Sequence, residues 1–404
     1  MKSIRQIKKL KNKIVFLRVD FNVPIEKGSI KEDYKIIQAL PTIRFLLRYG
    51  CRLIIATHLA EASTSKIKIS TKPIAQRLSQ LLDKKVNFIN NCCGELVIKA
   101  VDKLKTGEIL FLENLRSNKG EEENEKKFAK QLANLANLYV NDAFAVCHRN
   151  HASVSAIKKY LPAYVGLLLE KEIINLNKIN KPKKPLISII GGVKMKTKTI
   201  LIKKLLKKSH RMLIGGALAN NFIASHGFEV GHSIIDQDSI KIVTKLKNNA
   251  KIILPIDAIV SNRKDKSNAV AKSINKIEKN DMILDIGPKT IKLYASFIKQ
   301  ANTIIWNGPM GYFENEHFKH GTLAVARLIA SRSTGKAFGV VGGGETVEAL
   351  KITKMSEHID WVSTGGGAML AYLSGEKMPG LKGVCRRIPY SATDSLYKQN
   401  NIFQ

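Results

Sequence analysis

The sequence predicts an α/β fold built from two doubly wound, parallel-sheet domains joined by a hinge. Three observations support this prediction. The chain has 404 residues, which is more than one hydrophobic core usually supports. Short apolar runs alternate with amphipathic helical patterns, as in parallel sheets that helices cover on both faces. A Pro- and Lys-rich stretch at 181–185 interrupts the alternation and is typical of a linker.

In the first domain, four apolar runs predict strands, and helical patterns at 38–50 and 70–85 lie between them. A further helical pattern at 163–185 leads into the linker. The four strand runs are KIVFLRV (13–19), CRLIIAT (51–57), EILFLE (108–113) and NLYVND (137–142). We expect a first domain at 1–165, a helix and linker at 166–185, and a second domain at 186–380.

The second domain repeats one pattern, in which an apolar strand is followed by glycines and then by a helix. Glycines at the carboxyl ends of parallel strands let backbone N–H groups approach a ligand, and the following helix favours phosphate oxygens at its start. Six such corners in one domain predict a phosphate-rich, nucleotide-sized crevice. They are LISIIGGVK (186–194), MLIGGALANNF (212–222), MILDIGPKT (282–290), TIIWNGPMG (303–311), AFGVVGGGETVEAL (337–350) and DWVSTGGGAML (360–370).

Two common nucleotide motifs are missing. No stretch matches the P-loop pattern, since STGK at 333–336 lacks the upstream glycine. GGGETV and GGGAML both lack the third glycine of a dinucleotide fingerprint.

Polar residues of the first domain lie where predicted strands give way to loops. Arginine and histidine side chains gathered there suit an anionic ligand, because guanidinium groups pair with phosphate or carboxylate oxygens. An anion site on one domain and a nucleotide site on the other are typical of a phosphotransferase that closes around its hinge. The polar residues are Asp20, Asn22, His58, Arg116, Asp142, His148, Arg149 and His151.

The charge of +34, from 67 Lys and Arg against 33 Asp and Glu, favours anionic partners. Lysine supplies most of the excess and is spread along the whole chain, which indicates a composition-wide bias rather than a binding patch. No basic stretch interleaved with aromatic residues and no reading helix indicates a specific nucleic acid.

Five cysteines without a CxxC pair predict neither a disulfide framework nor a zinc site, and they fit a reducing compartment. The first apolar run is too short for a signal peptide, and no run approaches the roughly 18 residues of a membrane span. We therefore expect a cytoplasmic protein with no membrane partner.

A set of motifs that extends from about residue 13 to residue 380 resembles the phosphoglycerate kinase family in order and spacing. The resemblance implies two Rossmann-like domains, with a C-terminal segment, about 381–404, that packs back on the first domain. The motifs are RVDFNVP (18–24), ALPTI (39–43), LENLR (112–116), NDAF (141–144), HRNHAS (148–153), DIGPKT (285–290), NGPMGYFE (307–314), GGGET (342–346) and STGGGA (363–368).

The resemblance implies reversible phosphoryl transfer between 1,3-bisphosphoglycerate with ADP and 3-phosphoglycerate with ATP, in glycolysis and gluconeogenesis. It implies Mg²⁺ with the nucleotide, on the side of Glu345, and a monomer. The implied catalytic residues are Lys194, Lys35 and Arg149; the implied glycerate-binding residues are Asp20, Phe21, Asn22, Lys35, His58, Glu61, Arg116 and Arg149. The implied nucleotide-binding residues are Lys198, Gly215, Gly216, Gly287, Asn307, Glu314, Gly342, Gly343, Gly344, Glu345 and Thr346. If a helix begins near Val193, Lys194 and Lys198 share one of its faces.

The sequence departs from the family pattern at residues that the chemistry uses. Lys35 replaces an arginine and keeps the charge without the planar fork. Glu61 replaces the arginine of a Gly-Arg-Pro stretch and reverses the local charge, and Glu345 replaces an aspartate that is one methylene shorter. Val193 and Ala217 replace smaller residues.

Two hypotheses follow from these departures. The first is an active phosphoglycerate kinase with a weakened glycerate site. The alternative is a protein of the same fold that has lost most turnover and acts as a nucleotide-binding or structural protein.

Overall fold

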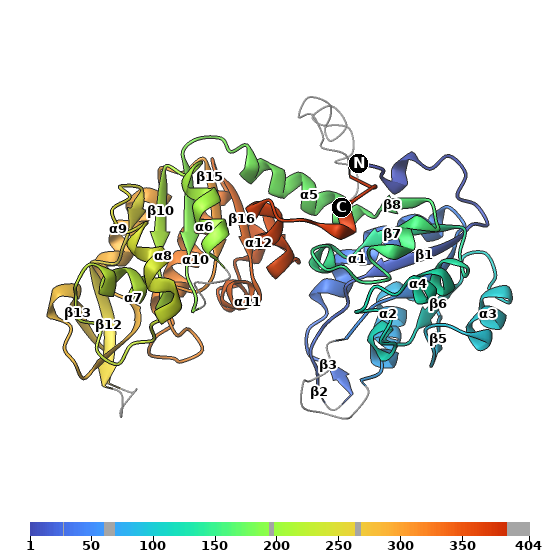
Figure 1. Ribbon diagram of the computed structural model, residues 1–404, viewed down its shortest axis with the longest axis horizontal. Coiled ribbons are helices and arrows are strands. Elements are labelled where there is room, and N and C mark those ends of the chain that lie inside the picture. Colours follow the sequence, from blue (N-terminus) through green and yellow to red (C-terminus); the bar gives the residue numbers. More distant parts are fainter. Residues whose placement is uncertain (27, 60–68, 194–197, 263–267, 386–404) are drawn as a thin grey trace. The chain divides into compact units, whose positions relative to one another are not determined.

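The computed structural model describes residues 1–26, 28–59, 69–193, 198–262 and 268–385 (Figure 1). The chain forms two compact units. Unit 1 contains residues 1–171 and the C-terminal residues from 378 onward, and unit 2 contains residues 172–377. None of the helices in the described ranges is long and apolar enough to cross a membrane.

Unit 1 is a six-stranded parallel sheet with helices around it, and the prediction of a parallel α/β domain is confirmed. The strand order is β5-β6-β4-β1-β7-β8, in which four strands are those that the apolar runs predict. The strands are β1 (Ile14–Val19), β4 (Arg52–Ala56), β5 (Val86–Ile89), β6 (Ile109–Leu112), β7 (Leu138–Asp142) and β8 (Ala163–Val165), beside a small hairpin of β2 (Ile25–Glu26) and β3 (Ser29–Ile30). The helices are α1 (Tyr34–Arg48), α2 (Lys72–Leu82), α3 (Glu95–Asp102), α4 (Lys126–Ala133) and the start of α5 (Leu167–Asn180).

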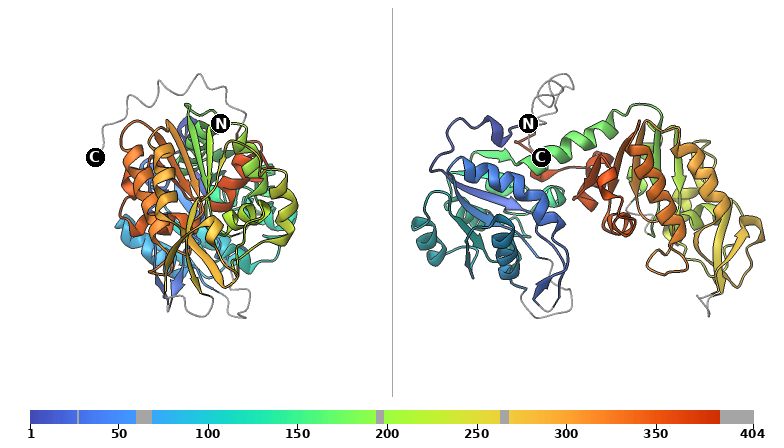
Figure 2. Two further views of the ribbon diagram at one scale, coloured as in Figure 1. Left: turned by 90° about the vertical axis from the view of Figure 1, so that its left-hand side faces the viewer. Right: turned by 180° about the vertical axis from the view of Figure 1, so that it is seen from behind.

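Unit 2 has a second parallel sheet, of order β11-β10-β9-β15-β16-β17, so the second predicted α/β domain is confirmed as well. Its strands are β9 (Leu186–Ile190), β10 (Arg211–Ile214), β11 (Ile252–Ile253), β15 (Thr303–Asn307), β16 (Phe338–Gly342) and β17 (Trp361–Ser363). Its helices are α6 (Thr199–Leu206), α7 (Gly216–Ser225), α8 (Ile240–Thr244), α9 (Pro288–Ile298), α10 (His320–Ser333), α11 (Gly344–Ile352) and α12 (Gly366–Ser374). Figure 2 shows α9 and α10, in orange, on one face of this sheet and α6 and α7, in green, on the other.

One corner of unit 2 differs from the prediction. The MILDIGPKT run forms β14 (Asp281–Ile286), which pairs antiparallel with β12 (Asp257–Asn262) in a separate three-stranded sheet completed by β13 (Val270–Ser273). Its assignment to the parallel sheet is therefore wrong. A strand that ends in glycine before a helix looks the same in either sheet, because pairing direction depends on distant partners.

The strands are buried because their apolar runs form the two cores. In unit 1, Phe16 and Tyr139 stack with their ring centroids 6.3 Å apart. In unit 2, the fully buried Trp306 and Tyr294 belong to one cluster with the inner faces of α9 and α10. Each sheet is therefore a rigid support for the loops at its strand ends.

Helix α5 is held by a buried carboxylate in each unit. Asp142 Oδ1 accepts from the backbone N–H of Leu169 at 3.0 Å, both in unit 1. In unit 2, Glu172 is fully buried and accepts from Trp361 Nε1 and from Thr364. At the other end of the chain, residues 378–385 belong to unit 1, where Lys2 N donates to the carbonyl of Val384. The rest of the predicted C-terminal segment lies outside the described residues.

Candidate functional site

The predicted anion-binding residues of unit 1 follow the carboxyl ends of neighbouring strands. Asp20 follows β1, His58 follows β4, Arg116 follows β6 and Arg149 follows β7. These four strands are adjacent in the order β6-β4-β1-β7, so their ends meet at one edge of the sheet. We call these residues, together with Arg18, Lys35 and His151, the basic cluster.

Asp20 forms an ion pair with Lys35 and lies close to His58. The Lys35 ammonium lies 2.8 Å from Asp20 Oδ2, and His58 Nδ1 lies 3.7 Å from Asp20 Oδ1. Burial alone would raise the pKa of Asp20, but the charges of Lys35 and Arg18 outweigh it and lower the pKa. Asp20 is therefore ionised at neutral pH, and Lys35 reaches the end of β1.

Arg18, in β1, fixes the protonation of His58. The fully buried guanidinium donates through Nε to Ser153 Oγ at 2.9 Å, and its Nη2 lies 3.1 Å from His58 Nδ1. A guanidinium can only donate, so Nδ1 is the acceptor and the imidazole proton is on Nε2. Burial, and next the charge of Arg18, hold the pKa of His58 well below its usual range.

Arg116 and Arg149 add positive charge around the neutral imidazoles of the basic cluster. Arg149 and Arg116 lie close enough to His58 to lower its pKa. Burial, with Arg149 and Arg116 next, lowers the pKa of His151 to about 4. Arg116 also pairs with Glu122, Nε to Oε1, at 3.1 Å. Because the arginines keep their charge while the histidines stay neutral, the basic cluster attracts an anion without adding histidine charges of its own.

Two predicted residues of unit 1, Phe21 and Asp142, do not join this cluster through their side chains. Phe21 is fully buried and stacks on Phe111, so only its backbone is near the loop, where its N–H donates to Thr57 Oγ1 at 2.9 Å. The Asp142 side chain instead accepts a hydrogen bond from the start of α5, as described above. Glu61 lies outside the described residues. Asn22 comes two residues after Asp20, and its backbone N–H donates to Asp20 Oδ1 at 3.4 Å.

Arg18 and the buried residues around it were not among the site residues that the sequence predicted. Glu121 is fully buried, and its two carboxylate oxygens accept from Ser153 Oγ at 2.6 Å and from Ser153 N at 2.9 Å. The signal for Arg18 was present, since a charged residue inside an otherwise apolar strand must have buried partners. The signal for Glu121 was not, because it stands in the run GEEE, which resembles a solvated acidic turn.

In unit 2, the loops after β9, β10 and β15 are joined by backbone hydrogen bonds. Gly191 N donates to Asn307 O at 2.9 Å, and Gly192 N donates to Pro309 O at 2.8 Å. Gly216 N donates to Met310 O at 2.7 Å. The predicted convergence of glycine corners at one edge of the parallel sheet is therefore present for these three strands.

Two glycines of this edge are required by their surroundings. Gly308 has a φ of +93°, and a Cβ there would lie 2.2 Å from the carbonyl oxygen of Gly191. Gly343 has a φ of +106°, and a Cβ there would lie 2.7 Å from Asn307 Nδ2. Neither position accepts a side chain without rearrangement, because Gly308 packs against the backbone of Gly191 and Gly343 packs against the side-chain amide of Asn307.

Lys198 places a buried ammonium among these glycines. It is the N-cap residue of α6, which begins at Thr199, later than the start near Val193 that the sequence suggested. Its Nζ donates to the carbonyl of Gly191 and lies 2.5 Å from the position of a Cβ on Gly308. Burial lowers its pKa to about 8, and Glu345 counters that effect. Lys194, its predicted partner, lies outside the described residues.

The turn after β16 is fixed by Asn307 and Thr346. Asn307 Nδ2 donates to the carbonyl of Gly342 at 2.6 Å, and Gly308 N donates to Thr346 Oγ1 at 2.7 Å. Asn307 is 3% exposed, and its Oδ1 has no partner within the described ranges. Gly344 begins α11, so the helix N-terminus faces the same edge of the sheet.

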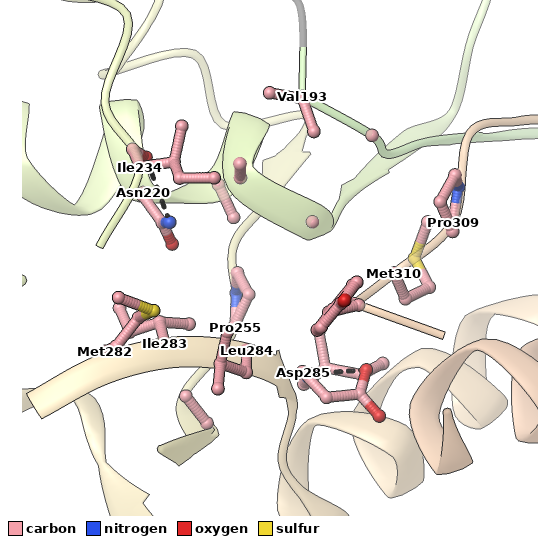
Figure 3. A pocket seen from close by; sticks show the side chains of 18 of the residues that line it. Val193, Asn220, Ile234, Pro255, Met282, Ile283, Leu284, Asp285, Pro309 and Met310 are labelled. Carbon is pink, nitrogen blue, oxygen red and sulfur yellow. Dashed lines mark hydrogen bonds between the residues drawn. The ribbon is translucent and has the colours of Figure 1, made fainter. Parts of the chain in front are cut away.

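Beside these loops lies a cavity of about 340 Å³ (Figure 3). Of the predicted residues it contains Gly216, Glu314 and Glu345 in its lining, while Gly287 comes one residue after the lining residue Ile286. The predicted Gly215 packs against Met310. The lining is mostly apolar, with Ile223, Ile234, Pro255, Met282, Ile283, Leu284 and Met310 among its members. A flat, apolar ligand group of base size fits such a space.

The carboxylates of this site fit a metal that a nucleotide brings with it. Glu345 is exposed in the first turn of α11 and is close enough to Lys198 to affect its pKa. The described residues contain no group of three acidic, His or Cys side chains that could hold a metal by themselves. Mg²⁺ commonly takes one or two carboxylates and completes its shell with substrate phosphates and water, so a single Glu345 is compatible with magnesium.

Comparisons with known proteins show which family the chain belongs to. The family model for phosphoglycerate kinase matches residues 4–376. The phosphoglycerate kinase of Wolbachia sp. subsp. Drosophila simulans is 41% identical over 387 residues, covering 94% of this chain and 97% of that protein. That of Dictyoglomus turgidum is 42% identical over 379 residues, covering 92% and 95%.

Solved structures show the same relationship. Phosphoglycerate kinase from Coxiella burnetii superposes with a TM-score of 0.82 at 36% identity, covering 94% of this chain and 97% of that chain. The enzyme from Pyrococcus horikoshii OT3 has a TM-score of 0.84 at 32% identity, covering 94% and 98%. The chain therefore belongs to the phosphoglycerate kinase family.

Proposed function

We propose that this chain transfers a phosphoryl group between ATP and 3-phosphoglycerate, with the glycerate ligand on the basic cluster of unit 1 and the nucleotide on the glycine loops of unit 2. Membership of the family makes the chain an ATP-dependent phosphotransferase with a carboxyl acceptor. The positions of the two ligands and the closure of the hinge are our proposals.

The strongest support for the nucleotide site comes from the surroundings of Lys198. A buried ammonium with a pKa of about 8 is costly unless an anion lies beside it. Its neighbours are glycine backbones, and Glu345 is the carboxylate that affects it. Phosphate oxygens at this point would pair with the ammonium and with backbone N–H groups, as is common where strands end in glycine corners.

On unit 1, the basic cluster would hold the phosphate and carboxylate of the glycerate ligand. Arg116 and Arg149 would pair with its anionic oxygens, and His58 would donate from Nε2. Asp20 is ionised and accepts only, so it would bind a hydroxyl group of the ligand. Lys35 would share its charge between Asp20 and the migrating phosphoryl group.

Phosphoryl transfer requires mainly that the protein position the two ligands and surround the migrating group with cations. Lys35 and Arg149 would supply such cations from unit 1, and Lys194 is the proposed one from unit 2. Glu345 would hold Mg²⁺ together with the nucleotide phosphates, and the ion would neutralise charge on the phosphate oxygens.

A coupled assay with 3-phosphoglycerate and Mg-ATP tests the proposal. Wild type should turn over, and Lys198→Met should raise the KM for ATP and lower kcat, because the buried ammonium beside the phosphates is lost. The matched control is Lys204→Met, an exposed lysine of the same helix, which should behave as wild type. Turnover that is equal in wild type and Lys198→Met would contradict the nucleotide site. ATP binding without turnover in wild type would support the alternative, a binding protein of this fold.

We also propose a monomer that acts in a reducing compartment such as the cytoplasm. All five cysteines are free, and Cys51, Cys92 and Cys147 are buried. Buried free thiols suit a compartment that keeps them reduced. Light scattering at assay concentrations tests the monomer, and a mass of twice 44.9 kDa would contradict it.

A further inference from the structure

The side chain of Asn220 leaves one buried acceptor without a donor. Asn220 lies on α7, is 1% exposed and belongs to the lining of the cavity of unit 2. Its Nδ2 donates to the carbonyl of Ile234 at 3.2 Å. Its Oδ1 finds no donor anywhere in the described part of the chain.

The orientation of this amide is fixed by chemistry. A backbone carbonyl only accepts, so the NH₂ group of Asn220 must be the end that faces Ile234. A flipped amide would place Asn220 Oδ1 against the carbonyl oxygen of Ile234, and neither atom can donate a hydrogen bond. Figure 3 shows the carboxamide between Ile234 on one side and Met282 and Ile283 on the other, with the oxygen on the side away from Ile234.

The surroundings of this oxygen are apolar. Figure 3 shows Ile234, Met282 and Ile283 around the carboxamide, and none of these side chains can donate a hydrogen bond. A buried acceptor without a donor is unfavourable, whereas a ligand that presents an N–H group at this point would restore the bond. The cavity therefore selects for a flat apolar group with one donor on its edge.

We propose that Asn220 reads the 6-position of the purine base, accepting a hydrogen bond from the amino group of adenine and rejecting a 6-oxo purine. The proposal rests on the proposed function, since it requires the base to occupy this cavity. The carbonyl oxygen of a 6-oxo purine would meet Asn220 Oδ1 acceptor to acceptor. The amide could not turn to help, because its NH₂ is held by Ile234.

The test compares nucleotides that differ only around position 6. ATP carries the 6-amino group, purine riboside triphosphate has hydrogen there, and inosine triphosphate has oxygen. We expect wild type to prefer ATP over purine riboside triphosphate by roughly 10- to 100-fold in kcat/KM, the effect of leaving one buried acceptor unpaired. Inosine triphosphate should be no better than purine riboside triphosphate.

Asn220→Leu, of similar volume and without an acceptor, should bring the ratio of ATP to purine riboside triphosphate close to one. The matched control is the next residue, Asn221, whose amide is satisfied: Oδ1 accepts from Asp236 N at 2.9 Å and Nδ2 donates to Ala217 O at 3.1 Å. Asn221→Ala should keep the wild-type ratio, whatever it does to stability. A ratio that is unchanged in Asn220→Leu would overturn the inference.

A third variant separates this inference from the proposed function. Ala217 lines the cavity on the half-buried side of α7, so Ala217→Phe should fill it without overpacking the core. If the base occupies the cavity, calorimetry should show that Ala217→Phe weakens the binding of all three nucleotides to a similar extent. Unchanged binding in Ala217→Phe would refute the nucleotide site itself. Weakened binding in Ala217→Phe together with an unchanged ratio in Asn220→Leu would refute only the role of Asn220.

Discussion

Replacing Glu172 should destabilise unit 2 more than any surface change, because its buried carboxylate satisfies four donors. Oε2 accepts from Trp361 Nε1 at 2.8 Å and from Ser363 Oγ at 2.9 Å. Oε1 accepts from Thr364 N and from Thr364 Oγ1, each at 2.7 Å. Ser363 Oγ also accepts from Gly365 N, so its own proton is free to point at Glu172. These bonds join α5 to the end of β17.

The size of this destabilisation follows from the number of groups that can only donate and cannot rotate to become acceptors. In Glu172→Gln, one acceptor oxygen becomes an NH₂ group, and the hydroxyl of Ser363 or Thr364 can rotate to accept from it. Trp361 Nε1 and Thr364 N only donate, so one of them loses its partner in either amide orientation. One lost bond to a charged acceptor costs about 2 kcal/mol. Glu172→Ala leaves all four donors without a partner and should cost about 4–5 kcal/mol.

Tryptophan fluorescence provides a selective assay, because both tryptophans of the chain, Trp306 and Trp361, belong to unit 2. In urea titrations followed by this signal, Glu172→Gln should lower the free energy of unfolding by about 2 kcal/mol, or the Tm of a unit this size by about 4–8 °C. The matched control, Glu316→Gln, changes an exposed carboxylate that pairs with Lys319 and should have no measurable effect.

A double-mutant cycle shows whether the network is the cause. If Trp361 Nε1 loses its bond in Glu172→Gln, the loss should be smaller in a Trp361→Phe background, where that donor is already gone. This pair is followed by circular dichroism, since the fluorescence of Trp361 is absent. A free energy of unfolding that stays within 0.5 kcal/mol of wild type in Glu172→Ala, about the size of an ordinary surface effect, would show that the Glu172 hydrogen bonds do not stabilise unit 2.

Other predictions concern unit 1 and the glycine loops. Burial raises the pKa of Asp142 to about 7 from an ordinary 3.8. The folded chain therefore binds this proton more tightly than the unfolded chain. As the pH rises from 4 to 7, the folded state loses up to about 4 kcal/mol of stability. Asp142→Asn should remove that loss, which urea titrations at pH 5 and 7.5 would show, and an equal pH dependence in both proteins would contradict it. Lys35→Arg should lower the KM for 3-phosphoglycerate about fivefold, since a guanidinium can bind Asp20 and a ligand oxygen together; an unchanged or higher KM in steady-state assays would argue against this geometry. Gly308→Ala should weaken nucleotide binding by at least about tenfold, because its Cβ would meet Gly191 and Lys198; wild-type affinity by calorimetry would show that the loop tolerates a side chain.

Much of the fold could be predicted because the parallel strands are continuous apolar runs. KIVFLRV and EILFLE have few polar residues to alternate with, as expected of strands that are covered on both faces. The antiparallel sheet of β12, β13 and β14 could not be predicted. Its strands alternate irregularly, and the DIGPKT corner is locally the same in parallel and antiparallel settings.

The strand-end residues of the candidate site were also accessible from sequence, because the carboxyl ends of parallel strands must meet at one edge. The buried partners were not. Glu172 stands in a helical pattern with Glu170 and Lys171 that looks solvated, and its donors come almost 200 residues later. Asn220 is one of two adjacent asparagines, and only the fold shows that one amide is satisfied and the other is not.

Detection of the acyl phosphate product itself tests the proposed phosphoryl transfer directly. Wild-type protein would be incubated with 3-phosphoglycerate, Mg²⁺ and ATP, and the product trapped with hydroxylamine as a hydroxamate. We expect hydroxamate that depends on both substrates and on Mg²⁺, and that falls sharply in Lys198→Met. No hydroxamate from wild type, with ATP binding intact by calorimetry, would contradict the claim that this chain transfers a phosphoryl group to a carboxylate.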